Sequence, residues 1–455
     1  MIRRLVLWLD DRLGAASFAR KALRKAFPDH WAFMLGEVAL YAYVALLVTG
    51  VFLTFFFTAS GEDVVYQGSY VPLRGQRMSA AYASVLRLSF DVRAGLVMRQ
   101  IHHWAALVFV AAIVAHALRV FFTGAFRRPR EINWLIGTSL LLLAMAAGFT
   151  GYSLPDDLLS GTGIRIAYSV LLSIPVVGTW AAFLFFGGEF PAPVTIGRLL
   201  ALHIMLIQGL ILAALGAHLA IIWHQKHTQF RAPGRTENTV VGSPLWPNYA
   251  MKSVGLGLAV IAVLAALGGL FQINPVWLYG PYIPTTVSSP AQPDWYIGWL
   301  EGALRLMPNW ELRGFGHAVP EPFFPGVFLP GVLIAIFALW PFIEQRVTGD
   351  RAVHHFLDRA RDAPRRSGVG AGALTFIVLL TLAGSNDVIA RFFGVPVETV
   401  TVILRGVALI APPVAGWVTY VVCRELRAAE GRPAGAWHAL RRGAGGGYLT
   451  EDEKG

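Results

Sequence analysis

Eight apolar runs, separated by polar loops, constrain the fold of this chain more than any other feature of its sequence. A helix needs about 20 apolar residues to cross a hydrocarbon core about 30 Å thick. Lipid offers no hydrogen-bond partners to a peptide backbone, so a run of this length must be helical. The sequence therefore predicts an all-α integral membrane protein with eight transmembrane helices, over Val38–Ala59, His102–Gly124, Asn133–Leu154, Arg198–Trp223, Ser253–Phe271, Val327–Phe342, Gly370–Ala383 and Val400–Cys423. The sixth and seventh runs are short, and their ends are the least defined.

The composition agrees with this fold class, because 55% of the 455 residues are hydrophobic and only 14% are charged. Soluble domains carry more charge than this. The net charge of +11 does not require a nucleic-acid partner, since lysine and arginine are distributed by side of the membrane. With eight spans both termini lie on one side, which holds 26 of these residues against 10 on the other. By the positive-inside rule, we expect a multi-pass plasma-membrane protein with both termini in the cytoplasm.

Charge and loop composition divide the chain into four segments. Residues 1–36 form a basic, amphipathic cytoplasmic segment that we expect to lie as a helix at the membrane surface, and 426–455 form a cytoplasmic tail. Residues 37–236 hold four spans, and 237–425 hold the other four together with a long external loop. The single cysteine, Cys423, excludes a disulfide within the chain, a C-x-x-C-H haem attachment site and a cluster held by several thiolates.

Histidines inside the second and fourth spans are the strongest functional signal, because a polar side chain in lipid is costly. On the second span, His102 and His116 are 14 residues apart, which places them within ~40° of one helix face and ~21 Å apart. His103 lies ~140° from His116, so the geometry selects His102. On the fourth span, His203 and His218 are 15 residues apart, ~60° in angle and ~22 Å in height. The two helices thus carry matched histidines at two levels of the membrane.

Facing histidines on two helices suit bis-imidazole ligation of haem iron, with the macrocycle buried in a four-helix bundle. We predict two b haems stacked across the membrane, an outer one on His102 and His203 and an inner one on His116 and His218. Zinc is the rival metal, but neither level offers the four donors of a tetrahedral site. Hydrogen bonding between helices is the other alternative, and it explains a single histidine more readily than two matched pairs.

Glycines and arginines surround the two predicted haem levels. Glycines 14 residues apart lie on the first and third spans, where the absence of a Cβ lets a flat ring approach the backbone. Close helix packing would use the same residues. Arginines near each level can pair with haem propionates or anchor the ends of the helices. The residues concerned are Gly36, Gly50, Gly137, Gly151, Arg99, Arg119 and Arg198.

The combined pattern resembles the cytochrome b subunit of the quinol–cytochrome c reductases, also called cytochrome bc complexes. The second span reads R-x-x-H-x13-H from Arg99, and the fourth reads R-x4-H-x14-H from Arg198. Gly151–Pro155 read GYSLP, like the start of the family's external helical hairpin, and Pro293–Tyr296 read PDWY, like its Pro-Glu-Trp-Tyr signature. The similarity covers essentially the whole chain and is nearest to the actinobacterial branch.

The resemblance implies that quinol, and in this branch menaquinol, is oxidised at an external site. One electron would pass to a Rieske iron–sulfur partner and the other to the low-potential and then the high-potential b haem. Quinone would be reduced at the cytoplasmic side, and a proton gradient would be built. The external-site residues implied are Tyr152, Pro293, Asp294, Trp295 and Tyr296, with Asp294 as the proton acceptor in place of the family's longer glutamate.

The cytoplasmic quinone site has weaker sequence signals. The family often has an acid near the start of the fifth span, where this chain has Lys252–Ser253, and His224 is the candidate histidine. The resemblance also implies a di-haem cytochrome c subunit, a haem–copper terminal oxidase, a second copy of the chain and membrane lipid as partners. Two alternatives stay open: another di-haem membrane cytochrome b reductase, and a transporter whose histidines carry protons or a metal.

Overall fold

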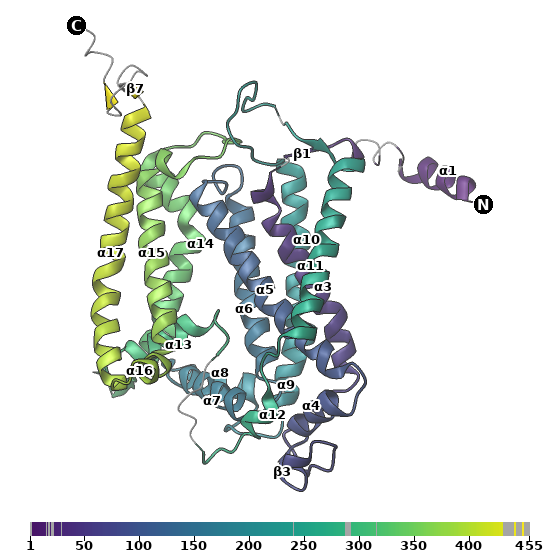
Figure 1. Cartoon of the computed structure of the whole chain (residues 1–455), viewed down its shortest axis with the longest axis vertical. Coiled ribbons are helices and arrows are strands. Elements are labelled where there is room, and N and C mark those ends of the chain that lie inside the picture. Colours follow the sequence, from purple (N-terminus) through teal and green to yellow (C-terminus); the bar gives the residue numbers. More distant parts are fainter. Residues whose placement is uncertain are drawn as a thin grey trace.

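Eight helices long and apolar enough to cross a membrane form the body of the molecule (Figure 1). The structure is a computed structural model, and it describes residues 2–14, 16, 19, 22–28, 30–239, 241–286, 293–314, 316–430, 441–442 and 448–449. Within these residues the spans are α3 (Leu35–Thr54), α5 (Gly95–Phe122), α6 (Glu131–Tyr152), α9–η3–α10 (Thr195–Ala201, Leu202–Ile207, Gln208–Gln225), η4–α11 (Leu245–Tyr249, Ala250–Leu270), η5–α14 (Phe324–Phe328, Leu329–Thr348), α15 (Pro364–Ala383) and α17 (Val397–Glu430). The predicted all-α membrane fold with eight spans is confirmed.

All eight helices extend beyond the predicted apolar runs at one end or both, although the first ends at Thr54 and not at Ala59. The sixth, predicted over Val327–Phe342, covers Phe324–Thr348, while the seventh begins at Pro364 and the eighth ends at Glu430. The added segments contain arginines, and a long basic side chain can keep its charge in water while the helix continues. Hydropathy therefore predicts which segments cross the membrane but does not predict the residues at which the helices begin and end.

The two ends of the bundle are built differently. Figure 1 shows the amino end of α1 and the carboxyl end of α17 at one end, here called the termini end. That end also holds a short antiparallel sheet in which β1 pairs with β4, a strand far away in the sequence. The elements on this side are α1 (Ile2–Leu13), β1 (Ala26–Phe27), η1 (Trp31–Phe33), β4 (Ser243–Pro244), η6 (Ala360–Asp362), β7 (Arg441–Arg442) and β8 (Tyr448–Leu449). Most of the predicted tail 426–455 lies outside the described residues.

Short helices and hairpins fill the long loops at the opposite end (Figure 1). Two of these loops connect the third to the fourth span and the fifth to the sixth, and both were expected to carry function. Both loops contain regular secondary structure along much of their length. The elements are β2 (Asp63–Val65), η2 (Val71–Leu73), β3 (Arg77–Ser79), α4 (Ala80–Phe90), α7 (Leu158–Leu172), α8 (Gly178–Phe186), α12 (Val276–Tyr279), α13 (Gly298–Leu306), β5 (Leu312–Gly314), β6 (His317–Val319) and α16 (Asn386–Phe393).

Small side chains let the helices of the N-terminal half approach closely. One buried cluster joins α3, α5, α6, the fourth span and α11, and alanine is its commonest residue. In lipid, van der Waals packing between helices drives their association, and small residues allow the closest packing. A polar pair in this core satisfies itself, because Tyr43 Oη donates to Gln208 Oε1 over 3.0 Å. The packed N-terminal half is the frame on which the histidines are mounted.

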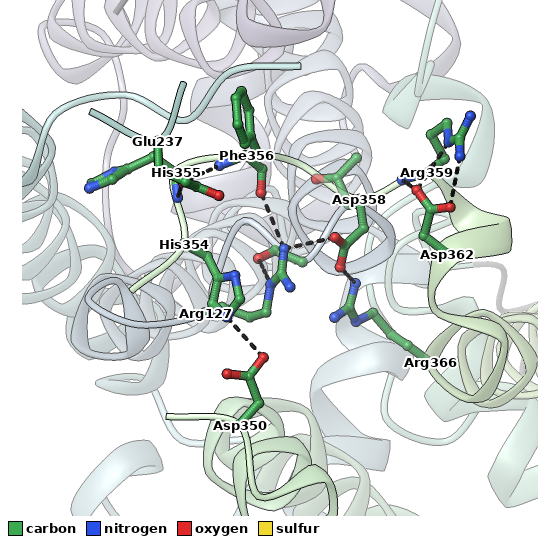
Figure 2. A network of polar contacts seen from close by, with 12 residues as sticks. Arg127, Glu237, Asp350, His354, His355, Phe356, Asp358, Arg359, Asp362 and Arg366 are labelled. Carbon is green, nitrogen blue, oxygen red and sulfur yellow. Dashed lines mark hydrogen bonds and ion pairs between the residues drawn. The ribbon is translucent and has the colours of Figure 1, made fainter. Parts of the chain in front are cut away.

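A network of ion pairs joins the two halves at the termini end. Figure 2 shows Asp358, in the loop before α15, between Arg127 at 2.9 Å and Arg366 at 3.0 Å. Arg366 is only 4% exposed and also pairs with Glu344 of α14. Glu237, from the connection between the fourth and fifth spans, accepts backbone N–H groups of the same loop. The loop before α15 is thereby tied to both halves of the molecule.

We expect replacement of Arg366 by methionine to destabilise the chain by roughly 3–5 kcal/mol. The substitution removes one guanidinium and leaves the Glu344 and Asp358 carboxylates short of a partner in a buried setting. The measurement is the equilibrium unfolding midpoint in mixed micelles. Arg313→Gln is the control, because Arg313 is 78% exposed beside Glu311, and its midpoint should not move. Equal midpoints for the two variants would contradict the importance assigned to the network.

Candidate functional site

Threonines of neighbouring helices hold the two histidines nearer the loop-rich end. Nδ1 of His102, on α5, is 2.9 Å from Oγ1 of Thr49 on α3. Nδ1 of His203, on the fourth span, is 3.1 Å from Oγ1 of Thr150 on α6. Each threonine hydroxyl donates its own proton to a carbonyl of its helix, at 2.6 Å for Thr49 and 2.8 Å for Thr150. The hydroxyl oxygen is then free only to accept from the imidazole.

These hydrogen bonds assign the tautomer of both rings. When Nδ1 carries the proton, Nε2 keeps its lone pair, which is the arrangement found in metal-ligating histidines whose other nitrogen is held by a hydrogen bond. The two imidazoles lie close enough to interact electrostatically. The outer level therefore presents two oriented nitrogen donors from two different helices.

The second pair, His116 and His218, faces across the bundle nearer the termini end. The ring centroids are 6.4 Å apart, and the ring planes make an angle of 75°. Both Nδ1 atoms are buried without a hydrogen-bond partner among the described residues. With Arg119 and His227 the two rings line a cavity of about 110 Å³. Buried polar atoms without partners are uncommon, and beside a cavity they indicate a site that takes a ligand.

Each of the four histidines lies against a glycine. A Cβ placed on Gly50 would be 3.2 Å from His102, and one on Gly151 would be 2.7 Å from His203. At the inner level the corresponding distances are 3.4 Å from Gly36 to His116 and 3.5 Å from Gly137 to His218. The repeated spacing of 14 residues therefore places the glycines at the two histidine levels. What they make room for in this structure is the imidazole ring itself.

The fourth span matches the second through a π-helical turn. This turn, Leu202–Ile207, contains His203. A π turn carries one residue more than an α turn, so the 15 residues from His203 to His218 rotate about as far as 14 would in a regular α-helix. The offset then becomes about 40°, as on α5, instead of the ~60° expected for an uninterrupted α-helix. The different spacings of the two helices are thus structurally equivalent.

The donor set fits haem iron better than the rival metal. Each level supplies two imidazoles, which suits the two axial positions of a haem. Zinc would require four ligands arranged tetrahedrally. In the part of the chain that the structure describes, no three His, Cys, Asp or Glu side chains gather in a metal-binding arrangement.

The three candidate arginines have different surroundings. Arg99 is buried and donates through Nη2 to the carbonyl of Asn274 at 2.7 Å, while its Nε has no partner. Arg119 lines the inner cavity, and its guanidinium lies 4.9 Å from the ring centre of Phe33, again with Nε unpartnered. Arg198 donates to two carbonyls at the end of α8. Arg99 and Arg119 therefore retain a free donor for an anion, and Arg198 supports the external hairpin.

Asp294 is the centre of a polar group at the loop-rich end. Its Oδ1 is 3.0 Å from Nε2 of His103 on α5, and its Oδ2 accepts from the Tyr296 hydroxyl at 3.0 Å. Burial raises the pKa of Tyr296 well above its usual value, and the Asp294 carboxylate adds to that rise. Tyr152, at the end of α6, interacts electrostatically with both. The neighbouring Trp295, whose ring is nearly perpendicular to that of Tyr296, is 43% exposed.

The two external loops meet beside this group. Asp157 begins α7 with a capping box in which its carboxylate accepts from the backbone of Leu159 and Ser160. The backbone N–H of Leu158 donates to the carbonyl of Gly280 at 2.9 Å, and that of Tyr282 donates to Asp156 at 3.0 Å. The hairpin that follows Gly151 is therefore joined to the loop that leads to Pro293. Sequence separation had left this contact undetermined.

A second polar group lies at the termini end, around Glu37 of α3. Its carboxylate accepts from the hydroxyls of Tyr249 and Ser253, and Ser253 Oγ is also 2.8 Å from the hydroxyl of Tyr41. Glu37 directly follows Gly36, the residue that touches His116. His224 is exposed and does not line the inner cavity, whereas His227 does.

The sequence contained signals for some residues that were missed. Thr49–Gly50 and Thr150–Gly151 are the same dipeptide on two helices, at the same histidine level. Glu37 was the only acid at the start of the first span. The contact of His103 with Asp294 joins residues 191 positions apart, and no local pattern indicates it.

A methyl group at Gly151 should remove the outer haem while leaving the inner one. The added Cβ of Gly151→Ala would lie 2.7 Å from the His203 ring, closer than side-chain contacts tolerate, so the ring must turn. The expected result is a reduced-minus-oxidised spectrum with one b haem per chain instead of two. Gly216→Ala is the control, since a Cβ there meets nothing within 4 Å. Two intact haems in Gly151→Ala would contradict the assignment of the outer level.

Comparison with known proteins agrees with this geometry. The family described as Cytochrome b(N-terminal)/b6/petB matches residues 107–281. The cytochrome bc1 complex cytochrome b subunit of Streptomyces coelicolor is 51% identical over 425 residues, which cover 93% of this chain and 78% of that protein. The corresponding Mycobacterium tuberculosis subunit is 51% identical over 423 residues, with 93% and 77% covered.

A solved structure has the same fold. A chain of the structure described as Hyperthermophilic respiratory Complex III superposes with a TM-score of 0.65 at 18% identity, covering 91% of this chain and 99% of that one. Proteins of the cytochrome b family bind b haems and act on quinones. Identity above 50% across nearly the whole length, together with the arrangement of the histidines, establishes the family. The chain belongs to the cytochrome b subunits of the bacterial cytochrome bc1 complex, a quinol–cytochrome c oxidoreductase of the plasma membrane.

Proposed function

We propose that this chain is a di-haem subunit that oxidises menaquinol at its loop-rich end and reduces quinone at its termini end, building a proton gradient. The observation that carries the proposal is the pair of imidazole levels, each shared by α5 and the fourth span. His102 and His203 would hold one b haem, and His116 and His218 the other. When bound, the two haems supply one-electron chemistry along a path across the membrane.

The chain's own residues orient those groups and keep water away. Thr49 and Thr150 fix the outer imidazoles, and glycine backbones on α3 and α6 leave them room. Arg99 and Arg119, each with an unpartnered Nε, would bind propionate carboxylates. We assign no such role to Arg198, because its guanidinium already donates hydrogen bonds to two carbonyls at the end of α8.

At the external site, Asp294 would accept a proton from the quinol hydroxyl. His103 and Tyr296 hold its two carboxylate oxygens, so the side chain is oriented before substrate arrives. Pro293 and the exposed Trp295 would line the entrance, with Tyr152 on the opposite wall. A positioned carboxylate of this kind is suited to general-base catalysis. The shorter aspartate is thus supported by neighbours that lie within hydrogen-bond distance.

Replacement of Asp294 by asparagine tests the external site. The amide keeps the size of the side chain but cannot take up the proton, so quinol oxidation should fall by about 100-fold or more. The assay is turnover of the purified complex with a soluble quinol, at unchanged haem content. Asp63→Asn, an exposed acid on β2 at the same end, should turn over normally. Normal turnover of Asp294→Asn would remove this residue from the reaction.

At the termini end, we propose that Glu37 delivers protons to quinone. Quinone reduction consumes protons, and Glu37 is a carboxylate in the first turn of a span, held by Tyr249 and Ser253. Ionisable side chains within membrane spans usually serve a function. Ser253 was expected at this site in place of the family's acid, and its hydrogen bond to Glu37 supports the proposal that Glu37 of α3 is the acid. His227 lines the inner cavity, so we propose it in place of His224 as the histidine of this site.

The variant Glu37→Gln separates the two quinone sites. It keeps the size of the side chain and one oxygen that can accept from a hydroxyl, but it cannot take up or release a proton, so electron transfer to added quinone should slow by about 100-fold. The first turnover of quinol oxidation at the external site should remain normal. Glu425→Gln, an exposed acid at the same end of the chain, serves as the matched control. If quinone reduction continues at the wild-type rate in Glu37→Gln, another group supplies the protons.

The family also suggests partners and an orientation. We propose a Rieske iron–sulfur subunit as the acceptor of one electron, a di-haem cytochrome c subunit as its outlet, a homodimeric core and association with a haem–copper oxidase. The loop-rich end would face outward and both termini the cytoplasm, as the distribution of lysine and arginine indicates. The segments 1–36, 37–236, 237–425 and 426–455 remain the proposed organisation.

A further inference from the structure

A large groove opens at the termini end of the C-terminal half, away from all four histidines. Its volume is about 1140 Å³, and α14, α15 and α17 form its walls. None of the haem or quinone residues proposed above lines it. The groove therefore needs an explanation of its own.

The groove exists because α14 packs elsewhere. The ring of Trp134 on α6 lies 4.6 Å from that of Phe337 on α14 and donates to the Phe337 carbonyl at 2.8 Å. On the other side, α15 and α17 approach so closely that a Cβ on Gly368 would lie 2.8 Å from the Gly416 carbonyl. The sixth span is thus held to the N-terminal half, and the last two spans form a separate pair. The space between them opens toward the surrounding membrane.

The depth of the groove corresponds to one leaflet of a bilayer. Along α15 its lining runs from Pro364 to Phe376, which is about 18 Å of helix. Half of a hydrocarbon core measures about 15 Å. The deeper walls are apolar and include the exposed side chains of Val369 and Trp417. Acyl chains of a single leaflet would fit this depth.

The rim of the groove is basic. Arg365, Arg424 and Arg427 line it and are exposed. Arg424 pairs with the equally exposed Glu425, a contact of small energetic value.

The carboxylates that line the groove are largely compensated. Glu344 and Asp358 bind Arg366, Asp362 binds Arg359, and Asp350 lies 2.9 Å from His354. Glu131 and Asp350 are the lining acids that pair with no lysine or arginine among the described residues. Arg365, Arg424 and Arg427, together with the exposed Arg128 of the same lining, give the rim a positive charge at the level of lipid headgroups.

We propose that this groove binds one anionic phospholipid, with its phosphate against Arg365, Arg424 and Arg427 and its two acyl chains against α14, α15 and α17. Basic pockets between transmembrane helices on the positive side of a membrane protein attract anionic headgroups. The lipid fills the space between the sixth span and the last two, which the ion pair of Arg366 with Glu344 joins at this end. A zwitterionic lipid could place its acyl chains against the same walls, but its neutral headgroup would gain no net electrostatic attraction from the arginines of the rim.

Lipid retention by the purified complex tests this assignment. The probes are phosphatidylglycerol and phosphatidylcholine, each with two oleoyl chains, added to delipidated complex and counted by native mass spectrometry. The wild type should retain one phosphatidylglycerol per chain in preference to phosphatidylcholine. The variant Arg365→Gln/Arg424→Gln/Arg427→Gln should bind phosphatidylglycerol about 10- to 100-fold more weakly, since each charge near a headgroup contributes to affinity.

Two further variants distinguish the contribution of the arginines at the rim to lipid binding from that of the apolar walls. Arg3→Gln/Arg4→Gln/Arg12→Gln removes the same charge from exposed positions of α1, outside the groove, and should bind like the wild type. Val369→Trp fills the acyl path without changing charge and should weaken both lipids. Equal retention of the two lipids by the wild type, or an equal effect of the two triple variants, would overturn the proposal. A photo-crosslinker at position 369 should capture phospholipid, and capture of a protein helix would also overturn it.

Discussion

Every polar side chain that enters the membrane must find its partner inside the protein, and this constraint determines where the functional groups lie. His102 and His203 meet it through threonine hydroxyls that are themselves anchored to helix carbonyls. That arrangement places the proton on Nδ1 of each ring, so Nε2 keeps the lone pair that could bind a metal. His116 and His218 meet it only in part, because both Nδ1 atoms lack a partner beside a cavity. The outer level is thus preorganised by the chain, and the inner level stays open to a further group or to water.

Periodicity and spacing predicted the features that depend on one helix at a time. The eight spans follow from hydropathy, and the selection of His102 over His103 follows from the rotation of an α-helix. The helix ends did not follow, because arginines such as Arg346 let a helix continue past its apolar run. Nor did the π turn at His203, which makes a spacing of 15 residues equivalent to one of 14. A turn of this kind leaves no mark in the identity of the residues that form it.

Contacts between residues far apart in the sequence could not be predicted from it. These contacts determine which side chains surround Asp294 at one end of the bundle and Glu37 at the other. Neighbouring residues on a helix point about 100° apart, so His102 faces Thr49 while His103 faces Asp294. The sequence could show only that His103 does not share the face of His116. At the termini end, an acid was sought at the start of the fifth span, where Ser253 stands. The carboxylate next to Ser253 belongs to Glu37 on the first span, and the two residues meet because α3 and α11 share one core.

The two halves of the chain are held together in different ways. The N-terminal half carries the histidines on helices packed through small residues, where a Cβ on Gly151 would lie only 2.7 Å from the His203 ring. The C-terminal half supplies the loop that brings Asp294 to α5, and it is fastened at the other end by Arg366, Asp358 and Glu344. Direct helix packing between the sixth and the last two spans is not what secures it, since a groove separates them there. The C-terminal half is therefore held at the termini end by ion pairs, and at the opposite end it contacts α5 through Asp294.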